Sequence, residues 1–154
     1  MPVSADVPGR EPLALEFLLL DVNGTLTDRG SLIQGVAERL AAIGERLEVR
    51  ILSADTFGTL ETIAIELGAR AERVASGADK ARVVAELGAA RCAVIGNGVN
   101  DAAMLEAAAL GIAVVGPEGA AGAALRAADV VCASILDALD LLLDERALVA
   151  TLRS

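Results

Sequence analysis

The sequence predicts an α/β domain in which helices cover both faces of a central, doubly wound parallel sheet of about five or six strands. Strand-like and helix-like segments alternate along the chain, and the strands are continuous apolar runs without polar alternation. At 154 residues the chain is long enough for a substantial core, so we expect a single domain over residues 1–154.

The first half of the chain contains three predicted strands. Residues 1–11 are polar and are expected to form a loose arm or a short edge element. A strand is predicted over 13–20, a small hairpin within 25–33 around Asp28-Arg29-Gly30, a helix over 35–46, a strand over 47–52, a helix over 56–67 that ends at Gly68, and a strand over 69–75.

The second half repeats the alternation three more times. The predicted elements are a helix over 80–87, a strand over 92–95, a helix over 102–109, a strand over 112–115, a helix over 119–127 with Pro117 near its start, and a strand over 130–133. Ser134 is expected to cap a last helix that carries Leu136, Leu139, Leu142 and Leu143.

Composition argues against several classes of function. The net charge of −9 disfavours nucleic acid and anionic lipid as partners, and no apolar run is long enough to predict a membrane-spanning helix. The amino terminus does not resemble a signal peptide. Cys92 and Cys132 lie in apolar segments, which predicts reduced thiols in a cytoplasmic protein. The chain has no histidine, which excludes histidine-based acid–base catalysis and histidine metal ligands.

The stretch Leu20 to Asp28, which reads LDVNGTLTD, ends the first strand in a carboxylate. Asp21 follows the apolar run directly, and Gly24 allows the backbone to turn sharply. Ligands bind beyond the carboxyl ends of the strands in open α/β sheets. Asp21 is therefore a candidate nucleophile or metal ligand, although a solvated aspartate that closes a strand fits the position equally well.

Other strand ends also carry polar residues. Ser53 follows the second strand, Lys80 follows the third, and Asn97, Asn100 and Asp101 follow the fourth. Lys80 is the only lysine beside twelve arginines, which suggests that a compact charge is required there. Each residue also has a structural interpretation: Ser53 as a turn residue, Lys80 as a chance surface residue, and Asn100 or Asp101 as a helix cap.

In order and spacing, these segments resemble the four motifs of the haloacid dehalogenase (HAD) superfamily of phosphatases and P-type ATPases. DVNGTLTD is similar to the first motif, Ser53-Ala54-Asp55 to the second, Lys80 to the third and GNGVNDAAM to the fourth. The similarity extends from Leu13 to about Leu143. It is greatest to small P-type-ATPase-like members that lack a cap domain, whose first motif often reads DVNGT.

The resemblance implies a Mg²⁺-dependent phosphohydrolase with a phosphorylated substrate. Asp21 would attack phosphorus and form an aspartyl-phosphate, and Lys80 would offset the repulsion between Asp21 and the substrate. Phosphoryl oxygens would be held by Ser53, Ala54, Lys80, Asn100 and the backbone amides of Gly24 and Thr25, and Mg²⁺ by Asp21, the Asn23 carbonyl, Asn97 and Asp101. Relatives without a cap often form oligomers, which makes a homo-oligomer compatible with this family.

Two residues depart from the family pattern. Asn23 stands where phosphatases carry an aspartate that acts as general acid and base, and Asn97 stands where a metal-binding aspartate is usual. These amides predict modest activity and weaker metal binding. They leave open a non-catalytic protein that binds metal, phosphate or a protein partner, and the strand-end aspartate with a lysine also leaves open a phospho-accepting switch domain.

Overall fold

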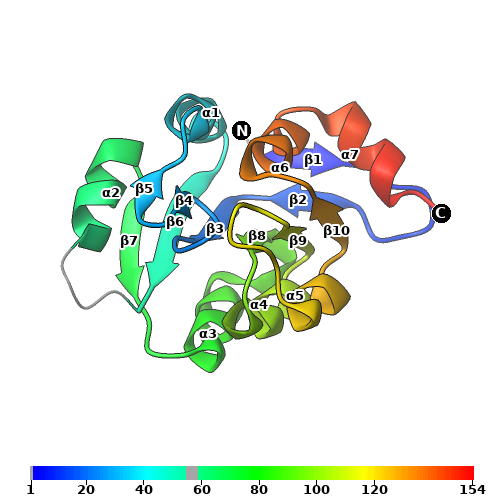
Figure 1. Ribbon diagram of the computed structural model, residues 1–154. Helices are drawn as coiled ribbons and strands as arrows, with labels where there is room; N and C mark the ends of the chain where they lie inside the picture. Colours follow the sequence, from blue (N-terminus) through cyan, green and yellow to red (C-terminus); the bar gives the residue numbers. More distant parts are fainter. Residues whose placement is uncertain (1, 55–58) are drawn as a thin grey trace.

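The computed structural model describes residues 2–54 and 59–154. Within them the chain forms a six-stranded sheet in the order β10–β9–β8–β3–β6–β7 (Figure 1). Every neighbouring pair is parallel, so the predicted fold class is confirmed. The strands are β3 (Phe17–Asp21), β6 (Glu48–Ser53), β7 (Arg70–Arg73), β8 (Cys92–Gly96), β9 (Leu110–Val114) and β10 (Val130–Cys132).

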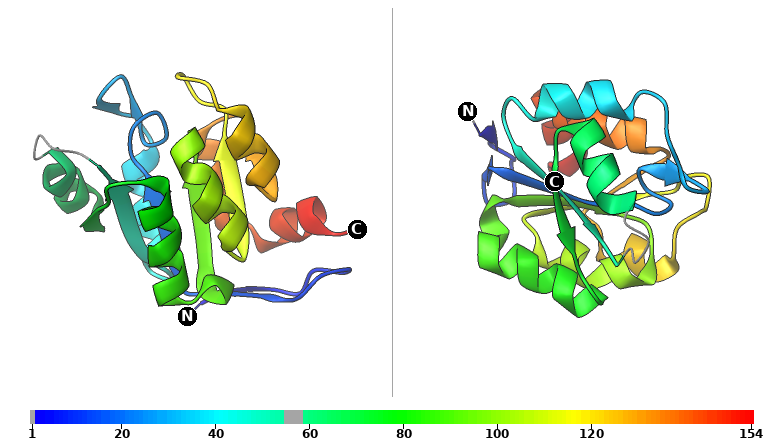
Figure 2. Two further views of the ribbon diagram at one scale, coloured as in Figure 1. Left: turned by 90° about the horizontal axis from the view of Figure 1, so that it is seen from below. Right: turned by 90° about the vertical axis from the view of Figure 1, so that its left-hand side faces the viewer.

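Helices cover both faces of this sheet (Figures 1 and 2). One face carries α1 (Val36–Ile43), α2 (Thr59–Leu67) and α6 (Ile135–Leu142), and the other carries α3 (Gly77–Leu87), α4 (Ala102–Ala107) and α5 (Gly122–Ala127). Because neither face of the inner strands meets water, these strands are apolar at consecutive positions. The continuous apolar runs in the sequence therefore reflect a sheet that is covered by helices on both faces.

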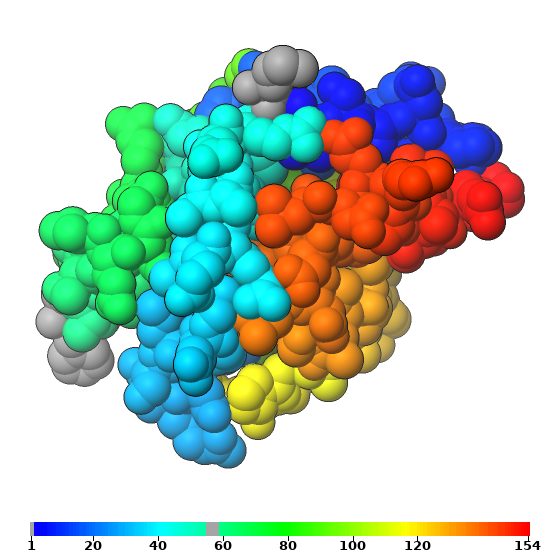
Figure 3. Space-filling model, turned by 90° about the horizontal axis from the view of Figure 1, so that it is seen from above, coloured from blue at the N-terminus to red at the C-terminus, as the bar shows by residue number. Residues whose placement is uncertain are grey.

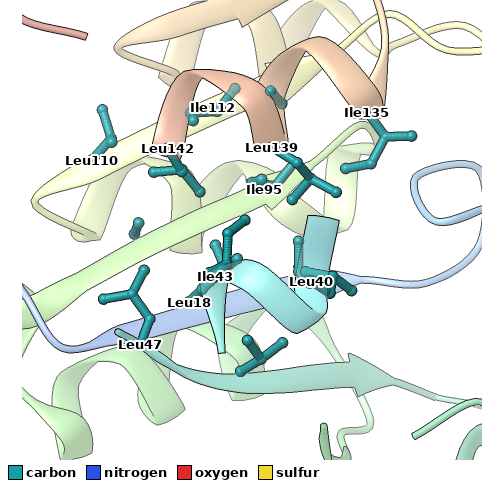
Figure 4. Close-up of a cluster of buried hydrophobic side chains, with 14 of the residues drawn as sticks. Leu18, Leu40, Ile43, Leu47, Ile95, Leu110, Ile112, Ile135, Leu139 and Leu142 are labelled. Atoms are coloured by element: carbon teal, nitrogen blue, oxygen red, sulfur yellow. The ribbon is translucent and has the colours of Figure 1, made fainter. Parts of the chain in front are cut away.

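The core is divided between the two faces by the alternation of the strands. Leu18 of β3 points to the cluster with Leu40, Ile43 and Leu139 (Figure 4). Leu20 belongs to the same cluster. Leu19 points the other way and joins the cluster of α3 and α4. Successive strand residues face opposite sides of a sheet, so a single run of leucines supplies both halves of the core.

Of the two alternatives expected for residues 1–11, the structure shows a short strand rather than a loose arm. β1 (Val3–Ala5) pairs in antiparallel fashion with β2 (Leu13–Leu15), and the predicted strand over 13–20 is divided into β2 and β3. Val3, Ala5 and Val7 alternate with polar residues, which gives this segment one buried apolar face. That face contacts α7 (Glu145–Leu152), at the end of the molecule opposite the 25–33 and 115–121 loops (Figure 2).

The predicted hairpin is present as β4 (Thr27–Asp28) and β5 (Ser31–Leu32). Its turn places Arg29 and Gly30 at positive φ, 49° and 91°, the region that glycine adopts readily. The predicted cap of α6 is also confirmed, because the Ser134 side chain accepts a hydrogen bond from the Asp137 backbone N–H.

Several helix boundaries differ from the prediction. α3 begins at Gly77 rather than Lys80, since Ser76 caps it by accepting from the Asp79 N–H. α5 begins at Gly122 rather than 119, because Gly116 and Gly119 close a separate turn around Pro117. α7, capped by Asp144, was not predicted. Residues 56–58 of the predicted second helix lie outside the described residues.

Every helix within residues 2–54 and 59–154 is too short or too polar to cross a lipid bilayer.

The first prediction concerns the core beneath α6. Leu139 is fully buried, whereas Leu143 at the end of the same helix is 41% exposed. Leu139→Ala should lower the free energy of unfolding in urea by about 2–5 kcal/mol, because it removes buried apolar contacts and leaves a cavity. Leu143→Ala, the matched control, should cost less than about 1 kcal/mol. Equal losses for the two variants would contradict the assignment of Leu139 to the core.

Candidate active site

The candidate site lies where the strand order reverses. From β3 the chain builds β6 and β7 on one side and then β8, β9 and β10 on the other, so the carboxyl ends of β3 and β8 flank the crevice in which doubly wound sheets bind ligands. Asp21 ends β3, and Asn97 directly follows β8. The predicted convergence of strand ends is therefore what the structure shows.

Lys80 lies at the centre of this crevice, between two carboxylates. Its Nζ is 2.9 Å from Asp21 Oδ1 and 2.7 Å from Asp101 Oδ1. All three residues are buried, with exposures of 2% for Lys80, 7% for Asp21 and 0% for Asp101. Charges this deeply buried must be compensated by partners, so the three residues form one electrostatic unit.

The start of α3 determines where Lys80 lies. Ser76 caps the helix, which places Lys80 in its first turn and aims the side chain at the sheet edge. Gly77 lets this end of α3 approach the loop after β8, because a Cβ at Gly77 would lie 2.7 Å from the Asn100 carbonyl oxygen. A larger residue at position 77 would therefore push Lys80 away from the two carboxylates.

Asp101 organises the loop after β8. Its Oδ2 accepts hydrogen bonds from the backbone N–H groups of Asn97 (3.0 Å) and Gly98 (2.9 Å), while its Oδ1 accepts from Lys80. Gly96 makes room for the carboxylate, since a Cβ there would lie 2.5 Å from Asp101 Cγ. Protein donors thus occupy both oxygens of Asp101.

Thr25 connects Asp21 to Asn97. Its hydroxyl is 3.1 Å from Asp21 Oδ2 and 3.2 Å from Asn97 Oδ1, and its single proton can serve only one of them at a time. The sequence predicts a role for the Thr25 backbone amide, whereas the contacts of its hydroxyl with Asp21 and Asn97 come from the structure. Gly24, at φ 75°, is required here because a Cβ would lie 2.7 Å from Asn97 Nδ2.

The remaining predicted residues surround this centre. Ser53 is buried at the end of β6, one position beyond Leu52, the residue that pairs with Asp21. Asn23, Ala54 and Asn100, which follow the carboxyl ends of β3, β6 and β8, are exposed. Asp55 of the predicted second motif lies outside the described residues.

The oxygen atoms of the site fit a weakly held Mg²⁺ ion rather than a closed metal cage. In the described part of the chain, no three Asp, Glu or Cys side chains are placed together to hold a metal. The Thr25 hydroxyl, however, has one proton and faces two oxygens, Asp21 Oδ2 and Asn97 Oδ1. One of these two oxygens is therefore available to bind a cation. Mg²⁺ takes oxygen ligands and keeps several waters, and this donor set suits it.

A cavity of about 650 Å³ adjoins the site. It lies between the 25–34 segment, the turn at Gly116 and Pro117, and the start of α6, where α1 and α6 run side by side (Figure 3). Thr25 lines this cavity and also bonds to Asp21. The described lining includes neither Asp21 nor Lys80, so the cavity neighbours the charged centre without containing it.

Burial and neighbouring charges shift the pKa values of both Asp21 and Lys80. Burial, followed by the nearby Asp101 carboxylate, raises the pKa of Asp21 from 3.8 to about 6, although Lys80 and Thr25 act in the opposite direction. Burial would lower the pKa of Lys80, but Asp21 and Asp101 outweigh it and the pKa is raised. At pH 7 Lys80 is charged, and Asp21 is ionised at a cost to the folded state.

This balance predicts opposite effects for two substitutions in metal-free protein. An aspartate whose pKa is raised in the folded state destabilises the protein at pH 7, and the cost disappears as the pH falls through 6 towards 3.8. Asp21→Asn should therefore raise the free energy of unfolding at pH 7 by about 1–3 kcal/mol, with a smaller gain at pH 5. Lys80→Met leaves two buried carboxylates uncompensated and should lower the free energy of unfolding at pH 7 by about 3–5 kcal/mol.

Denaturant unfolding in a chelating buffer at both pH values measures these effects. Asp6→Asn, at an exposed position between β1 and β2, is the control and should change stability by less than about 0.5 kcal/mol. If Asp21→Asn destabilised the protein at pH 7 as strongly as Lys80→Met, the charge balance described for this site would be wrong.

No protein-family model matches the sequence. Two uncharacterized proteins of Methanocaldococcus jannaschii are similar to it. MJ0073 is 52% identical over 59 residues, which are 38% of this chain, and the chain spans 63% of that protein's length. MJ0072 is 54% identical over 40 residues, which are 26% of this chain and 91% of MJ0072.

Solved structures match over most of the chain. A Streptomyces avermitilis protein assigned to the HAD family of hydrolases has a TM-score of 0.70 at 21% identity, with 88% of this chain and 89% of that chain covered. The 3-deoxy-D-manno-octulosonate 8-phosphate phosphatase of Moraxella catarrhalis, in complex with magnesium, phosphate and KDO, has a TM-score of 0.70 at 18% identity, with 90% and 94% covered.

A zinc-transporting PIB-type ATPase in the E2.Pi state has a TM-score of 0.61 at 29% identity, with 79% of this chain and 19% of the ATPase chain covered. These matches confirm the HAD-type fold expected from the resemblance of the sequence. The chain thus belongs to one family with MJ0072 and has the fold of the haloacid dehalogenase superfamily.

Proposed function

We propose that this chain is a Mg²⁺-dependent phosphohydrolase in which Asp21 accepts the phosphoryl group of a phosphate ester or anhydride and water then releases it. The observation that carries this proposal is the buried Lys80 that bridges Asp21 and Asp101 at the point where the strand order reverses. An isolated structural aspartate would not need a buried ammonium held by two carboxylates. The HAD fold of the chain and the phosphatase among its structural neighbours support the same reaction class.

In the proposed reaction, a carboxylate oxygen of Asp21 forms a bond to phosphorus while the bond from phosphorus to the leaving oxygen breaks. Lys80 offsets the repulsion between the ionised Asp21 and the anionic phosphoryl group, and Thr25 holds the carboxylate by its 3.1 Å contact. The raised pKa of Asp21, about 6, leaves it mainly ionised at pH 7 and more basic than an exposed aspartate. Both properties favour a nucleophilic carboxylate.

The oxygens that would hold Mg²⁺ are those of the Asp21 carboxylate, the Asn23 backbone carbonyl and the Asn97 side chain. When bound, the ion supplies positive charge at the phosphoryl oxygens. Because both Asp101 oxygens accept from protein donors, Asp101 would position the loop rather than hold the ion directly. The exposed Asn100 and the buried Ser53 would bind phosphoryl oxygens with the Gly24 and Thr25 amides.

Asn23 limits the rate at which a poor leaving group can be released. It is exposed beside Asp21 and can donate a hydrogen bond to a leaving oxygen, but an amide does not exchange a proton at neutral pH. The leaving group must therefore take its proton from solvent, which slows the release of poor leaving groups by about 10²–10⁴-fold. A long-lived phosphoenzyme would also fit the P-type-ATPase-like subgroup that the first motif and the zinc-transporting relative suggest.

A second candidate function is binding without turnover. The amides at positions 23 and 97 and the full engagement of Asp101 by protein donors favour it. In either case the described residues place no further domain over the site. A large substrate or a second copy of the chain would then cover it.

The nucleophile is tested with an activated aryl phosphate and Mg²⁺. A good leaving group needs no general acid, so the wild type should release the phenolate in a Mg²⁺-dependent manner, and Asp21→Asn should fall to the rate measured without protein. Asp6→Asn, an exposed site far from the crevice, should match the wild type. Equal rates for wild type and Asp21→Asn would show that the activity does not come from this site.

The missing acid is tested by Asn23→Asp. This variant should raise the turnover of an unactivated alkyl phosphate by about 10²–10⁴-fold and change the aryl phosphate rate by less than about tenfold, since only the poor leaving group needs a proton. The measurement is kcat for both esters under the same conditions. If Asn23→Asp changed kcat for the two substrates by a similar factor, the new aspartate would not be acting as a general acid, and the proposed role of position 23 would be wrong.

A further inference from the structure

We propose that Asn97 is a positioning residue that couples an ion at its side-chain oxygen to the 116–121 segment at its side-chain nitrogen. The proposal rests on the Mg²⁺ site proposed above. It assigns a role to the asparagine that an aspartate at position 97 could not perform.

The 116–121 segment begins with a tight turn. Gly116 and Gly119 form an isolated antiparallel bridge, with the Gly119 N–H donating to the Gly116 carbonyl at 2.9 Å. Pro117 occupies the second position of this turn and Gly119, at φ 78°, the last, residues that suit a turn of this kind. The segment is therefore a compact unit that can be held or released as a whole.

Asn97 holds this unit by two hydrogen bonds. Its side-chain Nδ2 donates to the Gly119 carbonyl at 3.2 Å, and its backbone carbonyl accepts from the Ala121 N–H at 2.8 Å. A third contact comes from the hairpin, where the Arg29 N–H donates to Glu118 Oε2 at 3.1 Å. The turn is thus tied to the loop after β8 and to the β4–β5 hairpin, the two segments that flank the charged centre.

The turn lies over the backbone beside Asp21. A Cβ on Gly24 would come within 2.7 Å of Asn97 Nδ2 and 3.5 Å of Glu118 Cβ, and a Cβ on Gly116 within 3.3 Å of the Gly24 carbonyl oxygen. These close approaches show that Gly24, Asn97 and the turn are packed directly on one another. A displacement of the turn would change the space around the Asp21 carboxylate.

Only an amide satisfies both neighbours of position 97. Asparagine presents a donor to Gly119 and an acceptor to Thr25. An aspartate would place a carboxylate oxygen against the Gly119 carbonyl oxygen, with no proton between them. It would also add a third carboxylate to the two that Lys80 already compensates.

The two ends of the amide are electronically linked. A cation at Oδ1 draws electron density through the conjugated amide and makes the Nδ2–H groups stronger donors. Binding of Mg²⁺ would therefore hold the turn more tightly. By reciprocity, a turn that is held in place raises the affinity for the ion.

Amide hydrogen exchange at Gly119 and Ala121 tests this coupling in intact protein, without reference to turnover. In chelating buffer, Asn97→Asp and Asn97→Ala should exchange these amides about tenfold faster than wild type, which is the loss expected for one hydrogen bond. Asp6→Asn, at an exposed position between β1 and β2 and outside the site, should exchange like wild type. Added Mg²⁺ should slow exchange at the turn in wild type and Asp6→Asn only.

A second measurement needs no variant. The chain contains three asparagines, and in wild type the side-chain amide protons of Asn97 should exchange more slowly than those of the exposed Asn23 and Asn100. Equal exchange among the three, unchanged exchange in both Asn97 variants, or Mg²⁺ that has no effect on the wild-type turn would each overturn the coupling. An inactive wild type with the expected exchange pattern would instead refute the proposed hydrolysis and leave the coupling intact.

Discussion

The placement of a buried lysine between two buried carboxylates is the constraint on which the rest of the site depends. Lys80, Asp21 and Asp101 come from three separate segments, and none of them can be buried at low cost unless the other two are close. The cap at Ser76, the glycines at 77 and 96, and the loop amides that bind Asp101 all serve this contact. The local geometry of the crevice therefore follows from compensation of charge.

The same constraint connects stability to chemistry. Two carboxylates share one ammonium, so the centre carries a net negative charge. Burial, and then the nearby Asp101 carboxylate, raise the pKa of Asp21 to about 6. A group whose ionised form is costly in the folded state is typical of sites selected for function rather than stability. A divalent cation would remove this excess charge, and the neutral Asn23 and Asn97 keep the centre from becoming still more negative.

Much of the site could be predicted from the sequence, because its residues follow strand ends and strand ends of a parallel sheet meet at one edge. Asp21, Lys80, Asn97 and Asp101 are joined by hydrogen bonds as that argument requires. The sequence did not predict the contact of the Thr25 hydroxyl with Asp21, the hydrogen bond that the Gly119 carbonyl accepts, or the one that the Glu118 carboxylate accepts. These contacts depend on the exact path of loops, and loop paths are determined by packing between segments distant in sequence.

The sequence by itself determined the alternation of elements, the parallel sheet covered on both faces and the residues at its carboxyl edge, because apolar runs and turn residues act locally. Only the tertiary structure decided that Val3–Ala5 form a strand with one face buried against α7, that protein donors take up both Asp101 oxygens, and that Asn97 bonds to the turn at Gly119. Each of these depends on contacts between segments far apart in the chain, and the pattern of residues along the sequence does not specify which distant atoms come into contact.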